Sequence, residues 1–250
     1  MPMADGSTGR GRSFDAWLCS AGGTAAWILL AYCLVTMIQL LVLGGPPATA
    51  EATFEVLQNN RLVGLLRLDL LTVLAMPLYY VLFFGLYAAL RHTNLRLAAV
   101  ATGLVVVGIT LFLTTPSVLS LAHLADRHAT AATAAQRQAY LAAGEALISA
   151  DMWHSTAGLL SGLFVQVAGV LISLAMLQGP VFSRRLGYVG IFTFGLDLGH
   201  ILAGLVSAEA GFLLMAISGP VYLLWFPWVG MRLRRLGRME PECGVSTPAP

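Results

Sequence analysis

Six apolar segments constrain the fold of this chain more than any other feature of its sequence. A helix needs about 20 apolar residues to cross a hydrocarbon layer of roughly 30 Å. Six segments meet that length: Ala25–Leu43, Leu70–Leu90, Leu97–Leu121, Thr156–Leu177, Leu186–Val206 and Ala210–Val229. In lipid, a helix satisfies its backbone polar groups within the segment. We therefore expect an all-α, polytopic integral membrane protein with a six-helix bundle over residues 25–237.

The composition agrees with this class, since 58% of the residues are hydrophobic, 10% are charged and the mean hydropathy is +0.79. A net charge of +2 is too small to indicate a nucleic-acid partner. Three cysteines, Cys19, Cys33 and Cys243, form no evident disulfide framework. The flanking residues 1–24 and 238–250 are expected to be disordered tails.

The arginines predict the orientation of the bundle. If both termini share a side, ten arginines fall on that side: Arg10, Arg12, Arg91, Arg96, Arg184, Arg185, Arg232, Arg234, Arg235 and Arg238. The other four, Arg61, Arg67, Arg127 and Arg137, lie in or beside two long connections. Cytoplasmic loops carry the excess of basic residues in membrane proteins. We therefore expect both termini in the cytoplasm.

The two long connections, Gly44–Asp69 and Ala122–Trp153, then lie outside. The stretch ATAATAAQRQAYLAAGEALIS, residues 129–149, is rich in helix formers and predicts an amphipathic helix over the outer end of the bundle. The start of the chain also resembles a signal peptide, with a small-residue site near Ala50. Its apolar run is longer than the usual 7–15 residues, which favours an uncleaved first helix.

Proline residues interrupt three of the six expected spans. Pro77, Pro116 and Pro220 lie in the second, third and sixth span respectively. Each removes a backbone hydrogen bond, so each is expected to bend its helix.

Asp197 and His200 form an unusual pair of ionisable residues inside the apolar stretch GLDLGHILAGL. An acid within a span is costly and usually faces the bundle interior or water. Three interpretations remain open. The two side chains can satisfy each other, being neighbours on one helix face. They can form an acid–base site with His154, in which case these three residues are the catalytic candidates. They can also bind a metal together with Asp151 and His154.

Other polar residues are expected near the outer ends of the helices. The motif DMWH repeats the Asp-x-x-His spacing at Asp151 and His154. Asp69 begins the second span, Glu209 precedes the sixth, and Tyr79 follows Pro77. Asp151, Asp69, Tyr79 and Glu209 are therefore the candidate ligand-binding residues. Gln39 and Gln166 are interpreted as interhelical hydrogen bonders.

Three stretches carry a resemblance to a known family: the QR…LAAGEAL segment, SLAMLQGPVFSRRLGYVGI and GPVYLLWFPWVGMRLRRLG. Over roughly residues 25–237 the chain resembles bacterial six-helix membrane proteins catalogued only as a domain of unknown function. The resemblance implies six helices, a long outer connection between the third and fourth, and a cytoplasmic turn at Ser183–Gly187. It implies no activity. The stretch DRHATAA differs from the Tyr-Ala-Ala-Ala-like sequence of the family, so His123, His128 and His154 are interpreted as departures from it.

Two main function hypotheses follow. The first is a protein with an outward-opening cavity that binds or moves a small hydrophobic compound or lipid. The alternative is a membrane-embedded enzyme on a lipid-like substrate, such as an acid-catalysed isoprenoid cyclase or a metal-assisted hydrolase. A third possibility is an assembly subunit. The sequence identifies no cofactor and no oligomeric state.

Overall fold

The computed structural model describes residues 7–115, 117–152 and 154–238, and within them every regular element is a helix. These helices are α1 (Ser7–Leu43), α2 (Ala50–Asn59), α3 (Arg61–Arg67), α4 (Leu70–Ala75), α5 (Leu78–Leu90), α6 (Leu95–Leu113), α7 (Val118–Ala129), α8 (Ala134–Ser149), α9 (Thr156–Leu177), α10 (Arg184–Gly204) and α11 (Ala208–Arg238). The predicted all-α class is confirmed.

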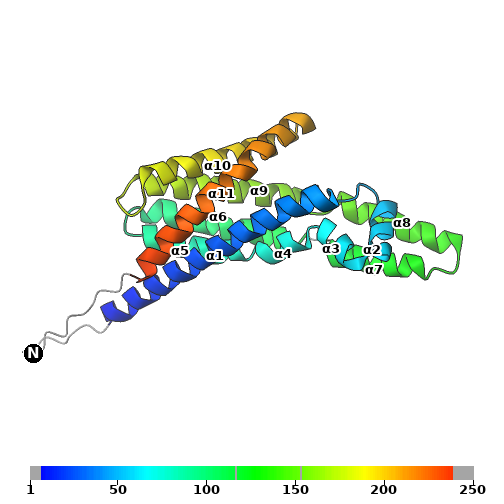
Figure 1. Ribbon diagram of the computed structural model, residues 1–250, viewed down its shortest axis with the longest axis horizontal. Helices are drawn as coiled ribbons and strands as arrows, with labels where there is room; N and C mark the ends of the chain where they lie inside the picture. Colours follow the sequence, from blue (N-terminus) through cyan, green and yellow to red (C-terminus); the bar gives the residue numbers. More distant parts are fainter. Residues whose placement is uncertain (1–6, 116, 153, 239–250) are drawn as a thin grey trace, which may run out of the picture.

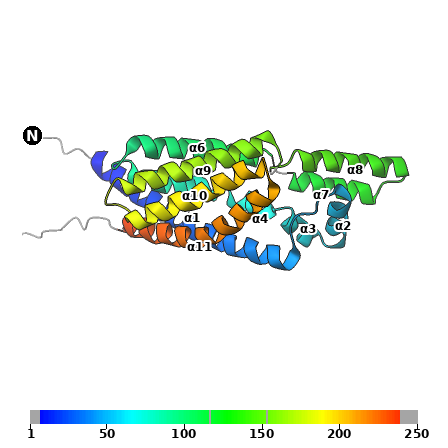
Figure 2. The same cartoon turned by 90° about the horizontal axis from the view of Figure 1, so that it is seen from above.

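Six helical segments are long and apolar enough to cross a membrane, as predicted. They form a ring in which α1 packs against α5 and α11, α11 against α10, α10 against α9, α9 against α6, and α6 against α5. The helices therefore follow one another around the ring in chain order (Figures 1 and 2). We call the end of the bundle where α1 begins and α11 ends the terminal end.

The first helix is longer than predicted. The sequence places its start at Ala25 and a disordered tail before it, but α1 begins at Ser7, so this boundary is wrong. Residues before Ala25 pack in the bundle because Gly22 and Gly85 bring the backbones of α1 and α5 into direct contact, which buries Cys19. The last helix likewise continues to Arg238. Residues 1–6 and 239–250, the rest of the predicted tails with Cys243, lie outside the described residues.

The second and third spans are interrupted near their prolines. The second consists of α4 and α5, which are separated at Met76 and Pro77. In the third, α6 ends at Leu113 and α7 begins at Val118, while Pro116 itself lies outside the described residues. In the sixth span, α11 continues through Pro220. Because the third span is interrupted at this point, Leu121 lies in α7, beyond the end of the bundle, whereas the sequence places it at the end of the third span.

Four helices, α2, α3, α7 and α8, form a separate unit that projects from the bundle (Figures 1 and 2). We call this unit the cap and the adjoining end of the bundle the cap end. The cap has its own apolar core, in which Phe54 and Leu57 of α2 pack with Leu121 and Ala125 of α7. The predicted helix at residues 129–149 is α8, which begins at Ala134 and lies along α7 instead of over the end of the bundle.

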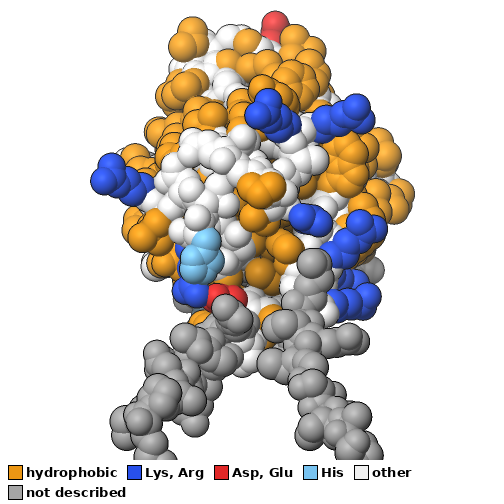
Figure 3. All heavy atoms as spheres, turned by 90° about the vertical axis from the view of Figure 1, so that its left-hand side faces the viewer, with side chains coloured by type: hydrophobic (Ala, Val, Ile, Leu, Met, Phe, Trp, Pro, Cys, Tyr) orange, Lys and Arg blue, Asp and Glu red, His pale blue; other side chains and the backbone are white. Residues whose placement is uncertain are grey.

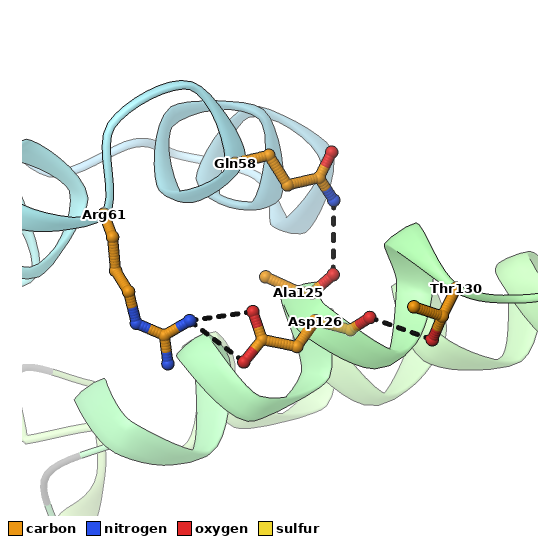
Figure 4. Close-up of polar contacts among 5 residues, drawn as sticks. All are labelled: Gln58, Arg61, Ala125, Asp126 and Thr130. Atoms are coloured by element: carbon orange, nitrogen blue, oxygen red, sulfur yellow. Dashed lines mark hydrogen bonds and ion pairs between the residues drawn. The ribbon is translucent and has the colours of Figure 1, made fainter.

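Polar contacts also join the α2–α3 segment of the cap to α7. The guanidinium of Arg61 donates to both carboxylate oxygens of Asp126, at 2.8 and 3.0 Å, and the Gln58 amide donates to the Ala125 carbonyl at 3.2 Å (Figure 4). Both carboxylate and guanidinium are more than half exposed, so this ion pair contributes little stability. The apolar core holds the cap together. Neither α2 nor α3 is predicted from the sequence, which reads residues 44–69 as a connection.

The bundle is packed unevenly along its length. Its fully buried aromatic side chains, including Phe83, Phe194, Trp225 and Phe226, lie in the half nearer the terminal end. Beyond Leu29, no residue of α1 is buried, and none of α10 is buried beyond Phe194. In Figure 1 the ends of α10 and α11 rise away from the end of α1. Packing in this part of the described chain therefore loosens toward the cap end.

Candidate functional site

Asp197 occupies the level at which this packing changes. It lies on α10 one turn beyond the buried Phe194, and about 20 Å along the helix axis from Arg184 at the usual helical rise. A carboxylate at this depth needs hydrogen-bond donors from neighbouring helices, because burying an unsatisfied charge is very costly. The surrounding side chains supply these donors.

Three neutral side chains donate to the Asp197 carboxylate. The amide of Gln166 on α9 donates to Oδ2 at 2.8 Å, and the hydroxyl of Tyr222 on α11 approaches the same oxygen at 3.1 Å. The hydroxyl of Ser218, also on α11, donates to Oδ1 at 2.8 Å. We call Asp197, Gln166, Ser218 and Tyr222 the Asp197 network. It joins three consecutive spans at their middle.

Two hydroxyl groups of the network have a second acceptor within reach. The Tyr222 hydroxyl lies 3.1 Å from Oε1 of Gln166, and the Ser218 hydroxyl lies 3.1 Å from the Met215 carbonyl. Each hydroxyl carries a single proton and so donates to one acceptor at a time. The network can therefore remain hydrogen-bonded when the carboxylate takes another partner.

His200 takes no part in this network. Its Nδ1 lies 2.9 Å from the carbonyl oxygen of Gly211 on α11. Because a carbonyl only accepts, Nδ1 carries the proton and donates. Nearby, Gly204 and Gly211 bring α10 and α11 into close contact. His200 thus fastens the α10–α11 hairpin, and the interpretation in which Asp197 and His200 satisfy each other does not match these contacts.

The second Asp-x-x-His motif does form a local pair. Nδ1 of His154 lies 2.9 Å from Oδ1 of Asp151, and the His154 backbone N–H donates to the same oxygen at 3.1 Å. This pair precedes α9, and Gln166 lies about 15 Å farther along that helix. The four candidate metal ligands therefore do not converge. Among the described residues, no three His, Cys, Asp or Glu side chains are placed to share a metal ion.

Of the remaining candidate residues, Asp69 and Glu209 lie at the cap end and Tyr79 lies deeper in the bundle. Asp69 joins α3 to α4 with a positive φ of 61°, a conformation that aspartate tolerates better than most residues. Glu209 is exposed in the first turn of α11. Tyr79 is buried and packs edge-on against Phe226, which in turn stacks on the ring of Tyr222. Of these residues, Tyr79 alone is placed near the network.

Ser218 and Tyr222 are the site residues that the sequence analysis missed. They lie four residues apart and therefore on one face of α11, which is a signal that the sequence contains. Gln166 is confirmed as an interhelical hydrogen bonder, as is Gln39, whose amide donates to the Leu66 carbonyl at 2.6 Å.

Two cavities lie elsewhere in the described residues. One, of about 420 Å³, lies between the α9–α10 turn and α11 at the terminal end. The other, of about 710 Å³, lies between α7 and α8 in the cap. Neither is lined by Asp197 or His200.

Comparison of the chain with protein-family models, curated proteins and solved structures gives no match. The resemblance to a six-helix family therefore stays a prediction.

Proposed function

We propose that this protein binds or moves a small, largely apolar compound or lipid, which enters the bundle from the cap end and places its polar group at Asp197. One observation carries the proposal: a membrane-depth carboxylate is held by neutral donors at the level where tight packing gives way to loose packing. Ligand sites are typically apolar with a few convergent polar groups.

The proposed ligand carries a hydrogen-bond donor or a positive charge beside its apolar part. Within the described residues, no arginine or histidine forms an ion pair with Asp197. The second acceptors of Tyr222 and Ser218 allow both hydroxyls to turn away while the carboxylate engages the ligand. This exchange replaces one set of hydrogen bonds by another, which avoids leaving a buried polar group unsatisfied.

The alternative function, an enzyme on a lipid-like substrate, has less support. Its acid–base version assigns His200 and His154 as partners of Asp197. His200 instead bonds Gly211, and His154 lies at the cap end of α9. Its metal-assisted version needs ligands that the described residues do not bring together.

Asp197→Asn tests the ligand site, because asparagine keeps the size of the side chain but removes the charge. We expect the purified variant to retain at most about a tenth of the compound that co-purifies with the parent, since a hydrogen bond to a charged group contributes about 1.5–3 kcal/mol. Mass spectrometry of solvent extracts measures this compound. Glu209→Gln, which neutralises an exposed acid, is the matched control and should retain it. Equal retention in Asp197→Asn and the parent contradicts the proposal.

We also propose that the protein lies in a bacterial cytoplasmic membrane with its terminal end in the cytoplasm. The distribution of arginine supports this orientation, since the described terminal-end arginines outnumber the four in and beside the cap. Figure 3 views the molecule from the terminal end, where several basic side chains gather.

Labelling of cysteine with a membrane-impermeant maleimide tests the orientation. Gln138→Cys places a thiol on the exposed side of α8, and Arg96→Cys places one in the first turn of α6. Both changes are made in a Cys243→Ser background to lower the labelling of the parent. In intact cells we expect labelling at position 138, whereas position 96 should react only after lysis. The reverse pattern would show that the termini lie outside.

A further inference from the structure

The cavity at the terminal end combines two basic side chains with an apolar wall. It is lined by Arg232, Arg235, Trp228 and Met231 of α11, and by residues 180–183 and Leu186 on the α9–α10 side. Its volume of about 420 Å³ is within the usual range for small-molecule sites. Asp197 does not line this cavity, so a molecule bound here is distinct from the ligand proposed above.

The guanidinium groups in this cavity lack an acidic partner among the described residues. Nε of Arg232 donates to the Val181 carbonyl at 2.6 Å, which fixes the side chain against the α9–α10 turn. None of the ion pairs in the described chain includes Arg232 or Arg235. The one described acid at this end, Asp15, pairs with Arg91. Among the described residues, the positive charge of the cavity therefore has no acidic counter-charge.

The position of the cavity on α11 indicates what kind of anion this is. Leu224, Trp228 and Met231 are exposed and recur at three- and four-residue spacings, so they form one outward stripe that ends at Arg235. On a membrane-spanning helix such a stripe contacts lipid. Tryptophan and arginine at the end of a span are typical of the membrane–water interface. A molecule in the cavity thus contacts basic groups at one end and the acyl region at the other.

We propose that this cavity binds a phospholipid with an anionic headgroup, from the leaflet at the terminal end. The phosphate is held by Arg232 and Arg235, and the upper part of an acyl chain lies along Trp228 and Met231. Guanidinium is well suited to phosphate because its N–H groups match the spacing of phosphate oxygens. This inference rests on the placement of the six helices in a membrane, and is independent of the ligand at Asp197.

Titration of the detergent-purified full chain with lipids tests the proposal, with bound lipid counted by native mass spectrometry. The probes are dioleoyl phosphatidylglycerol, dioleoyl phosphatidylcholine and glycerol 1-phosphate. The parent should bind phosphatidylglycerol more tightly than phosphatidylcholine. In R232Q/R235Q this affinity should fall by at least about tenfold, because a direct hydrogen bond from a guanidinium to a phosphate is charge-assisted and its loss costs roughly tenfold or more.

A matched control separates a site from general attraction. R96Q/R238Q removes the same charge from exposed positions at the terminal end that do not line the cavity. We expect its affinity for phosphatidylglycerol to fall less than about threefold, because exposed guanidinium groups that do not touch the lipid are screened by solvent and salt. The single variant Arg235→Gln keeps the contact of Arg232 with Val181 and should still weaken binding, which excludes a folding defect as the cause.

Three outcomes would overturn the proposal. Equal affinity of the parent for both lipids would show that the headgroup charge is not recognised. An equal loss in R96Q/R238Q would show a diffuse field instead of a site. Competition by glycerol 1-phosphate at concentrations similar to those of the lipid would identify a soluble phosphate compound as the occupant. Asp197→Asn should leave lipid binding unchanged, so failure of the ligand proposal remains distinguishable.

Discussion

Replacing Trp225 by alanine is expected to lower the free energy of unfolding by about 3–5 kcal/mol, the usual cost of removing a large aromatic side chain from a packed core. Trp225 is fully buried, with its ring 4.9 Å from that of Phe194 and 5.4 Å from that of Phe226. The cavity left by alanine is closed in by these rings and cannot collapse easily. Unfolding in mixed micelles of sodium dodecyl sulfate, followed by circular dichroism, measures the change.

Leu224→Ala is the matched control for this prediction. Leu224 is the preceding residue of α11 but is 61% exposed, so its truncation should cost less than about 1 kcal/mol. Trp225→Phe should fall between the two variants. Phenylalanine keeps an aromatic ring and removes the indole N–H, which has no hydrogen-bond partner among the described residues. Similar losses in Trp225→Ala and Leu224→Ala would mean that this aromatic cluster is not the core of the bundle.

Removing two donors from Asp197 is the second change with a large expected effect. The double variant S218A/Y222F leaves Gln166 as the remaining donor of the network, and we expect it to lower the free energy of unfolding by about 2–4 kcal/mol. A partly buried carboxylate at this depth that loses two of its three donors carries part of the cost of desolvation. The same unfolding assay in mixed micelles measures the loss.

A third substitution identifies the carboxylate as the cause of that loss. In D197L the acid is absent, while Ser218 and Tyr222 keep their second acceptors, Met215 and Gln166. Adding S218A/Y222F to D197L should therefore cost much less than adding it to the parent. Such non-additivity is expected for groups in direct contact. Additive losses would show that the hydroxyl groups stabilise the bundle independently of Asp197.

The bundle was largely predictable because apolar length alone decides which segments can span a membrane. The boundaries of the helices are harder to predict from the sequence. The part of α1 before Ala25 packs closely against α5 at Gly22 and against α11 at Ser20, and the pattern of residues in this stretch does not show these tertiary contacts. The cap was missed for a related reason. Short helices such as α3 are marginal in isolation, and here they are stabilised by a core that joins two separate connections.

Of the residues in the Asp197 network, the sequence indicates Asp197 as a site residue but does not indicate its hydrogen-bond partners. Asp197 stands out because a charge within a span is rare, but its partners depend on how α9, α10 and α11 are rotated against one another. The three-residue spacing predicts that His200 is the partner of Asp197. In the structure, the rotation of α10 instead directs the His200 ring toward the Gly211 carbonyl. Serine and tyrosine are common in membrane helices, so Ser218 and Tyr222 carry little signal until the opposing acid is known.

The cap has a consequence for how the chain assembles. The backbone N–H of Ala50 donates to the Glu145 side chain, 95 residues later, at 2.7 Å. At a synthesis rate of about 5–20 residues per second, α2 therefore waits for several seconds before α8 emerges. Once formed, the cap holds the connection between the first and second spans against the connection between the third and fourth. The principal contacts of the described helices include none between the cap and α10 or α11. The cap thus ties together the first four spans, whereas the last two are held by their packing against α1 and α9.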